Sequence, residues 1–200
     1  SPLKLASAYA IFAFGGYKIH PHFIRKIEDA NGNILAKVNF PKKNYSSTPI
    51  LDPRVAFIMS NMMQDVIKRG TGKKALQIGR TDLSGKTGTT NDQIDAWFAG
   101  YQRRLVAVSW VGYSKPKTLG KYATGAAVAL PIWISYMKEV LSDYEEELHI
   151  VPDGVIPIAI NSKNRFLHSN SEKKIIEYFL DEYTPSEAKP NINIFDEEIF

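Results

Sequence analysis

Leu83-Ser84-Gly85-Lys86-Thr87-Gly88-Thr89-Thr90 is the stretch on which the interpretation of this sequence depends. It combines one lysine, two glycines, three threonines and a serine. Threonine favours strands and offers a hydroxyl, whereas glycine lets another backbone or a ligand approach closely. A lysine beside a strand edge with a row of hydroxyls is suited to binding a carboxylate.

Two known motifs share these letters. The phosphate-binding loop requires a glycine, four residues and then Gly-Lys-Ser/Thr, but Arg80 stands where its first glycine should be. That loop also opens a helix after the lysine, and Thr87-Gly88-Thr89-Thr90 is a poor helix start. The other motif is Lys-Thr-Gly, one of three that mark a family of acyl-transfer enzymes. Taken alone, the tripeptide is also compatible with an exposed turn, so the rest of the chain must decide.

Composition excludes several classes of function. The 200 residues include 25 Lys and Arg against 21 Asp and Glu, and these charges are scattered, so no nucleic-acid partner is expected. The absence of cysteine excludes disulfides and thiolate catalysis. His20-Pro21-His22 has no further ligand beside it, so neither a metal nor another cofactor is expected. The longest apolar run, 126–134, is too short to span a bilayer and contains Pro131.

Capping signals and apolar spacing predict helices in three places. Ser1-Pro2 is typical of a helix start, and the apolar residues that follow predict a buried helix that ends at Gly15-Gly16. Asp52-Pro53 begins a second helix, which ends at Gly70. Residues 126–141 form the third, with Pro131 as a start or a kink. The expected core stripe of the first helix is Leu5, Ala8, Tyr9 and Phe12, and that of the second is Val55, Ile58, Met59, Met62 and Val66.

Strand-like segments occupy 81–90, 94–101 and 105–113, and Gln102-Arg103 fits a two-residue turn. Short links of this kind predict an antiparallel meander. Strands that are apolar on both faces must also be covered on both faces. The predicted fold class is therefore α+β, an antiparallel sheet covered by helices on both faces.

Two parts of the chain lie outside this pattern. Residues 17–50 are interpreted as a hairpin insertion, with strands at 23–29 and 34–40 around an Asn31-Gly32 turn. Residues 144–200 are interpreted as a C-terminal extension that follows a domain over 1–143. The extension is expected to hold a strand at 155–160 and a short helix at 173–180, then a loose tail rich in proline and asparagine.

Further short sequence motifs surround Lys-Thr-Gly in a specific order and spacing. Together they resemble the C-terminal half of the transpeptidase domain of class A (bifunctional) penicillin-binding proteins. The resemblance covers about residues 1–143, and it also implies the fold of serine β-lactamases. The matching words are Ser1 to Ala13, Gly15-Gly16-Tyr17, Arg69-Gly-Thr-Gly72, Ser84 to Asp92, Asp95 to Tyr101, Trp110-Val-Gly-Tyr113 and Pro131-Ile-Trp133.

The family's other two motifs, Ser-x-x-Lys with the acylated serine and Ser-x-Asn, precede Lys-Thr-Gly by a long distance. The matches in this sequence are Ser1/Lys4, Ser114/Lys117, Ser171/Lys174 and Ser162-Lys163-Asn164. The first aligns with a different family segment, and the others follow Lys86. We interpret all four as chance, so the nucleophile is not in this chain, and the chain is expected to be a fragment that needs the N-terminal part of the same protein.

The resemblance implies a peptidoglycan D,D-transpeptidase or carboxypeptidase that cross-links stem peptides through a serine acyl-enzyme and binds β-lactam antibiotics. Lys86 would supply positive potential and help to move a proton. Thr89 would lend its backbone N–H to the oxyanion hole, and the hydroxyls of Thr87 and Thr89 would hold the substrate carboxylate. Gly88 would keep the strand thin for the nucleophile. Asp95, Trp97 and Trp110 are expected to pack rather than to catalyse.

The resemblance further implies a glycosyltransferase domain upstream and a role in cell-wall synthesis and cell shape. It places the protein on the periplasmic face of the bacterial inner membrane, with the anchor outside these residues. The rival from another class is a non-catalytic scaffold module of cell-wall synthesis. A phosphate-binding loop protein is a more distant alternative.

Overall fold

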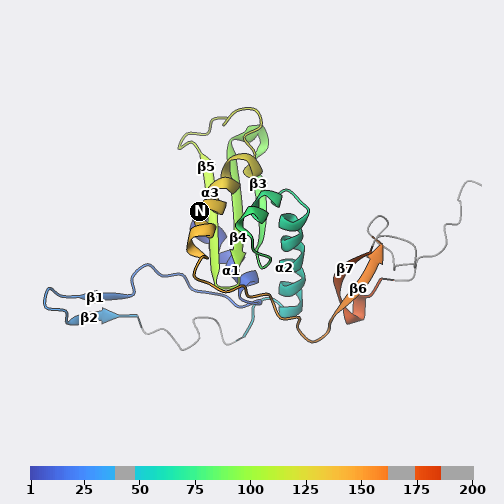
Figure 1. Cartoon of the computed structure of the whole chain (residues 1–200). Coiled ribbons are helices and arrows are strands. Elements are labelled where there is room, and N and C mark those ends of the chain that lie inside the picture. Colours follow the sequence, from blue (N-terminus) through green and yellow to red (C-terminus); the bar gives the residue numbers. More distant parts are fainter. Residues whose placement is uncertain (39–47, 162–173, 186–200) are drawn as a thin grey trace, which may run out of the picture. The chain divides into compact units, whose positions relative to one another are not determined.

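The structure is a computed structural model that describes residues 1–38, 48–161 and 174–185. The chain divides into two compact units, 1–150 and 151–200. The centre of the first unit is an antiparallel sheet of β3 (Ser84–Thr89), β4 (Asp95–Gln102) and β5 (Leu105–Gly112), in the order β3-β4-β5 (Figure 1). The predicted meander is therefore confirmed. The phosphate-loop interpretation is wrong, because Lys86 lies inside a strand and no helix begins there.

The predicted turn between the second and third strands is wrong by one residue. The structure pairs Gln102 with Leu105, so the turn is Arg103-Arg104. Gln102 stays in the strand because its side chain is fully buried and its Oε1 accepts the N–H of Arg104 at 2.8 Å. A polar residue thus ends a core strand by closing its own turn.

Helices cover both faces of the sheet, as predicted. Side chains alternate between the faces of a strand, so Tyr101 and Phe98 point to opposite sides. Tyr101 packs with α1 (Pro2–Ala13) and α2 (Pro53–Lys68), whereas Phe98 packs on Trp133 of α3 (Leu130–Val140), with ring centroids 4.9 Å apart. Figure 1 shows α3 crossing the sheet on its own side. Each face therefore has its own core.

The first two helices begin at the predicted caps. The Ser1 hydroxyl accepts the N–H of Lys4 at 3.5 Å, and the Asp52 carboxylate accepts that of Arg54 at 2.9 Å. The expectation of a buried helix at the N-terminus is wrong, however. Within α1 only Ala10 and Ala13 are buried, whereas Tyr9 and Phe12 are partly buried against the core around Tyr101.

The predicted core stripe of α2 is also wrong. Met62 is 56% exposed, and the other predicted stripe residues are only half-buried. The buried face lies beside that stripe and includes two polar residues, Ser60 and Gln64. Ser60 can be buried because its hydroxyl lies 2.8 Å from the Tyr101 hydroxyl and its carbonyl accepts a hydrogen bond from the Ser84 hydroxyl. The residues of the buried face are Ala56, Phe57, Ser60, Met63, Gln64 and Ile67.

The remaining elements of the unit are short. A 3-10 turn η1 (Lys73–Ile78) follows α2, and η2 (Asn91–Gln93) joins β3 to β4. A π-helical turn η3 (Gly125–Ala129) leads directly into α3, so Pro131 stands in the first turn of α3 as a start rather than a kink. No helix in the described ranges is long and apolar enough to cross a membrane.

In the sequence, a hairpin of β1 (Lys26–Glu28) and β2 (Ile34–Lys37) separates α1 from α2. Its predicted second strand reached residue 40, which lies outside the described residues. The two ends of the segment between α1 and α2 lie close together: the Gly16 carbonyl accepts hydrogen bonds from the N–H groups of Ile50 and Leu51 at 2.9 and 3.2 Å. This geometry leaves α1 and α2 adjacent whatever lies between them.

Residues 141–149, here called the strap, fasten to the end of the sheet at which β3 begins. The Arg80 guanidinium donates to the carbonyls of Leu141, Tyr144 and Glu145, and it also pairs with Asp82 at 2.8 Å. The strap therefore belongs to the first compact unit, which extends to Ile150.

We predict a pH-dependent stability from His149, at the end of the strap. Its ring lies edge-on to Tyr101, with centroids 6.2 Å apart, and its Nε2 is buried. Burial, and next the charge of Arg103, lower the pKa of His149, while Asp82 and Glu147 oppose the shift. A histidine whose folded-state pKa is lowered loses stabilisation as pH falls from the ordinary value of about 6.5 through the folded-state pKa.

The urea midpoint of the wild-type protein should therefore fall between about pH 7.5 and pH 5.5 more than that of His149→Gln, which cannot titrate there. NMR titration of the His149 ring gives the pKa directly. If the urea midpoints of the two proteins fell equally with pH, or if the pKa of His149 were normal, His149 would not be the source of the pH dependence.

The second unit contains a hairpin of β6 (Val155–Asn161) and β7 (Lys174–Leu180), followed by η4 (Asp181–Tyr183). The predicted strand at 155–160 is confirmed. The predicted helix at 173–180 is wrong, because its β-branched and aromatic residues pair with β6 along their whole length. Ser162-Lys163-Asn164, Ser171 and the tail after Pro190 lie outside the described residues.

Candidate functional site

Strand β3 forms one edge of the sheet, and in the described part of the chain no strand pairs with its outer side. The N–H of Thr90 donates to the Asp95 carbonyl at 3.0 Å, in register with the ladder below it. Hydrogen-bonded pairs alternate along an antiparallel ladder. The N–H and C=O groups of Thr87 and Thr89 therefore point away from β4, toward the free edge.

The predicted site residues lie together at this edge but on two faces of the strand. Alternation puts Lys86 and Gly88 on the face of α1 and α2, and Thr87 and Thr89 on the face of α3. Lys86 is exposed, and its Nζ donates to the outward carbonyl of Thr87 at 3.1 Å. The lysine charge and the outward N–H groups thus border the same strip of surface.

Each threonine hydroxyl at the edge has a partner from a distant part of the chain. The Thr87 Oγ1 lies 2.8 Å from the Thr71 Oγ1, in the link between α2 and η1. The Thr89 Oγ1 accepts the N–H of Gly125, at the start of η3, at 3.0 Å. Both side chains are therefore held in place without any ligand.

Gly125 lies directly against the site strand. A Cβ at this position would be 2.3 Å from the Trp97 carbonyl oxygen and 2.5 Å from that of Gly88, closer than any side chain permits. Glycine at 125 therefore lets η3 contact the backbone of β3 and β4, and so deliver its N–H to Thr89. At Gly88 itself, a Cβ would press on the Trp97 Cβ at 3.2 Å.

A buried hydroxyl network supports the strand near its start. Ser84 donates to the Ser60 carbonyl at 3.1 Å, and the hydroxyls of Ser60 and Tyr101 lie 2.8 Å apart. All three residues are at most 1% exposed, and burial raises the pKa of Tyr101, so its hydroxyl keeps its proton. The network therefore links β3 to α2, and α2 to β4.

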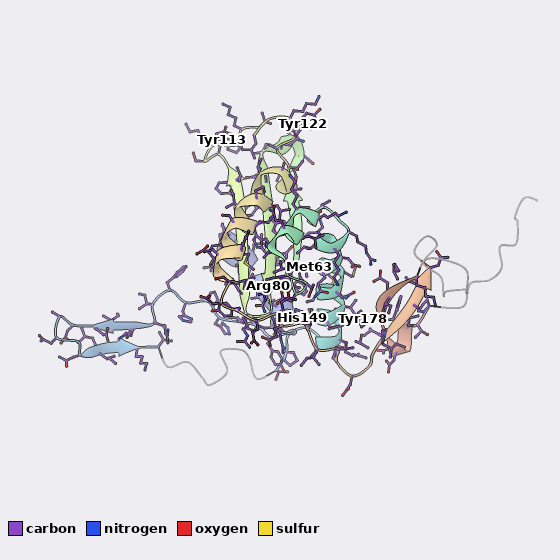
Figure 2. The ribbon with its side chains drawn as sticks, viewed as in Figure 1. Met63, Arg80, Tyr113, Tyr122, His149 and Tyr178 are labelled. Atoms are coloured by element: carbon purple, nitrogen blue, oxygen red, sulfur yellow. The ribbon has the colours of Figure 1, made fainter. Side chains whose placement is uncertain are left out.

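The residues expected to pack make contacts of that kind. Trp97 lies on Trp110, with ring centroids 5.8 Å apart, and the Trp110 Nε1 donates to Asp95 at 2.8 Å. Figure 2 shows Tyr113 and Tyr122 in the loops at this end of the sheet, with Arg80 and His149 at the opposite end. The strap is therefore remote from Thr89.

The rejected serine motifs have other surroundings. The Ser1 hydroxyl caps α1, and Ser114 to Lys117 lie in an exposed loop where Lys117 sits over the Tyr113 ring. Among the described residues, no group of three or more His, Asp or Glu side chains is arranged to hold a metal ion.

Sequence reasoning misses three residues that shape the site. Ser60 is missed because a pattern of apolar residues does not predict that a serine is buried. Gly125 looks like part of an apolar run, although a glycine that opens a helix is a usable signal. Thr71 stands between Gly70 and Gly72, a pattern that indicates a tight connection but does not indicate a partner for Thr87.

An antiparallel sheet covered by helices on both faces matches the architecture of the penicillin-binding transpeptidase class. The chain belongs to this family: the model described as "Penicillin binding protein transpeptidase domain" matches residues 1–132. Its relatives narrow the assignment to part of the transpeptidase domain of a class A penicillin-binding protein.

The chain is similar to penicillin-binding protein 1A of Pseudomonas aeruginosa, at 36% identity over 96% of this chain and 29% of the relative. The crystal structure of penicillin-binding protein 1A from Haemophilus influenzae superposes with a TM-score of 0.84 at 30% identity, over 95% of this chain and 33% of that one. The structure of PonA1 from Mycobacterium tuberculosis in complex with penicillin V superposes with a TM-score of 0.60 at 27% identity, over 74% of this chain and 40% of that one. The chain thus spans about a third or less of the first two proteins.

Proposed function

We propose that β3 forms one wall of a serine D,D-transpeptidase site, in which Lys86, Thr87, Gly88 and Thr89 bind the D-alanyl-D-alanine end of a stem peptide. The acylated serine comes from the part of the protein upstream of this chain. The observation that carries the proposal is the free edge of β3: two N–H groups point outward along it, with two hydroxyls on one face of the strand and one ammonium on the other.

The outward N–H of Thr89 is suited to an oxyanion hole. Such a donor must be fixed before the reaction, because pre-oriented dipoles stabilise the developing negative charge without reorganising. The strand holds this N–H in place through its ladder with β4. The second N–H of the hole would come from the upstream serine.

The substrate would lie along β3 as an added strand, with its terminal carboxylate at the hydroxyls of Thr87 and Thr89. Lys86 adds positive potential and a proton donor beside them. β-Lactams carry a carboxylate in a similar position relative to the reactive carbonyl, and PonA1, a relative of this chain, is described in complex with penicillin V. The same strip of surface would therefore bind substrate and antibiotic.

The full-length protein tests this proposal. Incubated with a pentapeptide that ends in D-alanyl-D-alanine, it should release D-alanine, and prior treatment with penicillin should abolish the release. A non-catalytic scaffold would release none and form no penicillin adduct. The same measurement therefore separates the two classes of function.

We also predict that the 200-residue chain by itself forms no covalent adduct with a fluorescent penicillin, because no Ser-x-x-Lys precedes Lys86 at the family's spacing. The intact mass should stay unchanged under conditions that label the full-length protein completely. Circular dichroism of the same sample checks that the chain is folded. A stable acyl adduct on any of its serines would contradict the assignment of the nucleophile.

A further inference from the structure

Thr71 is outside the Lys-Thr-Gly motif, yet its hydroxyl lies 2.8 Å from that of Thr87. We propose that Thr71 is a positioning residue: it donates its proton to the Thr87 Oγ1, so that the Thr87 proton points outward to the carboxylate of the ligand. The inference rests on the proposed function of β3 and adds a residue to that site.

The direction of this hydrogen bond matters because each hydroxyl carries one proton and only one of the two protons can lie between the two oxygens. If Thr71 donates, Thr87 keeps its own proton for an anion. If Thr87 donates to Thr71 instead, Thr87 presents only lone pairs, which repel a carboxylate. A bound carboxylate therefore selects the arrangement in which Thr71 is the donor.

Thr89 shows the same arrangement with its direction fixed. Its Oγ1 accepts the backbone N–H of Gly125 at 3.0 Å, and a backbone N–H can only donate. The Thr89 proton is therefore free for the ligand. Thr71 does for Thr87 what Gly125 does for Thr89, so both hydroxyls accept a hydrogen bond from another segment of the chain and keep their own proton for a ligand at the edge.

The backbone holds Thr71 in this position. The N–H of Gly72 donates to the Val66 carbonyl at 2.9 Å, which folds the link back onto the last turn of α2. A Cβ at Gly70 would lie 2.9 Å from the Val66 Cα, so this close contact requires glycine. Ala75, which is fully buried, anchors the following turn. Thr71 is thus an exposed side chain on a rigid support.

The test uses the full-length protein and two ligands, a penicillin with its free carboxylate and the methyl ester of the same penicillin. Thr71→Val keeps the shape of the side chain and removes the hydroxyl. Its second-order acylation rate should fall about tenfold for the acid but less than about twofold for the ester, because only the acid draws a charge-assisted hydrogen bond from Thr87. Thr71→Ser should restore the acid rate to within about twofold.

Thr81→Val is the matched control. It also removes a threonine hydroxyl that has a side-chain partner, the Glu146 carboxylate at 2.6 Å, but at the opposite end of β3. It should leave the acid-to-ester ratio of acylation rates unchanged. Circular dichroism of all variants separates loss of folding from loss of ligand selectivity.

Equal losses for acid and ester in Thr71→Val would overturn the inference, since a merely structural role lowers both rates alike. Failure of Thr71→Ser to recover the acid rate would do the same. If wild-type protein forms no adduct with either ligand, the proposed function itself fails, so the two failures are distinguishable.

Discussion

Lys86→Ala in the full-length protein should slow acylation by a penicillin by about two to three powers of ten, which corresponds to about 2–4 kcal/mol of transition-state stabilisation. The physical reason is the loss of the ammonium that borders the outward N–H groups and the hydroxyls that we propose bind the carboxylate. The melting temperature should barely change, because Lys86 is exposed and its Nζ bonds to the neighbouring carbonyl of Thr87 rather than to the core.

Lys86→Arg distinguishes two roles for this charge. If Lys86 only attracts the carboxylate, the arginine variant should keep most of the rate. If the compact ammonium must fit among hydroxyls and transfer a proton, the wide and permanently charged guanidinium should fail. We expect Arg to lose acylation about as much as Ala does. Stopped-flow acylation of the three proteins is the measurement, and an arginine variant within a few-fold of wild type would reduce Lys86 to a source of positive potential.

Asp82→Ala should be the most destabilising single change at the other end of β3. The Asp82 side chain is fully buried, pairs with Arg80 at 2.8 Å and accepts the N–H of Glu147 at 2.9 Å. Removing one partner of a buried ion pair costs about 3–5 kcal/mol. The melting temperature of the transpeptidase domain, followed by differential scanning fluorimetry, should fall by about 10 °C.

Asp65→Ala is the matched control for this change. Asp65 pairs with Arg69 on the surface of α2, where ion pairs contribute about 0–1 kcal/mol. Its melting temperature should stay close to that of the wild type. Similar losses for the two variants would show that the strap is not fastened through Asp82.

The effect of Asp82 should also depend on pH in a defined direction. Burial alone raises the pKa of Asp82, but the hydrogen bonds from Arg80 and the Glu147 N–H outweigh it, and the pKa lies below its usual value. Such a carboxylate stabilises the fold above the ordinary pKa of about 3.9 and loses that effect as pH falls through the lowered folded-state value. The loss of unfolding free energy caused by Asp82→Ala should therefore become smaller as the pH falls through the folded-state pKa of Asp82.

Local sequence signals predict the helices and strands of the first unit well where interactions between residues close in sequence determine them. Ser1 and Asp52 cap their helices, and apolar patterns place the three strands within a few residues. The order and spacing of short words around Lys-Thr-Gly are enough to identify the family. Neighbouring residues determine these features, because caps and strand pleats involve contacts a few positions apart.

Partners distant in sequence could not be predicted in the same way. The buried face of α2 includes Ser60 because the Tyr101 hydroxyl lies opposite it, and residues 174–180 form a strand because β6 supplies its hydrogen bonds. A hydropathy pattern assigns serine to the surface and ignores the partner strand. Only the packed structure shows that a polar side chain or an ambiguous segment has a partner.

Local patterns and motif spacing are enough to predict a strand that carries Lys-Thr-Gly-Thr and to identify the family. The partners of its side chains come from distant segments: η3 approaches through Gly125, and the link after α2 brings Thr71 to Thr87. No local pattern predicts these contacts, because a hydroxyl has no fixed proton direction of its own. Its direction is set by the donor behind it, and that donor comes from another part of the chain.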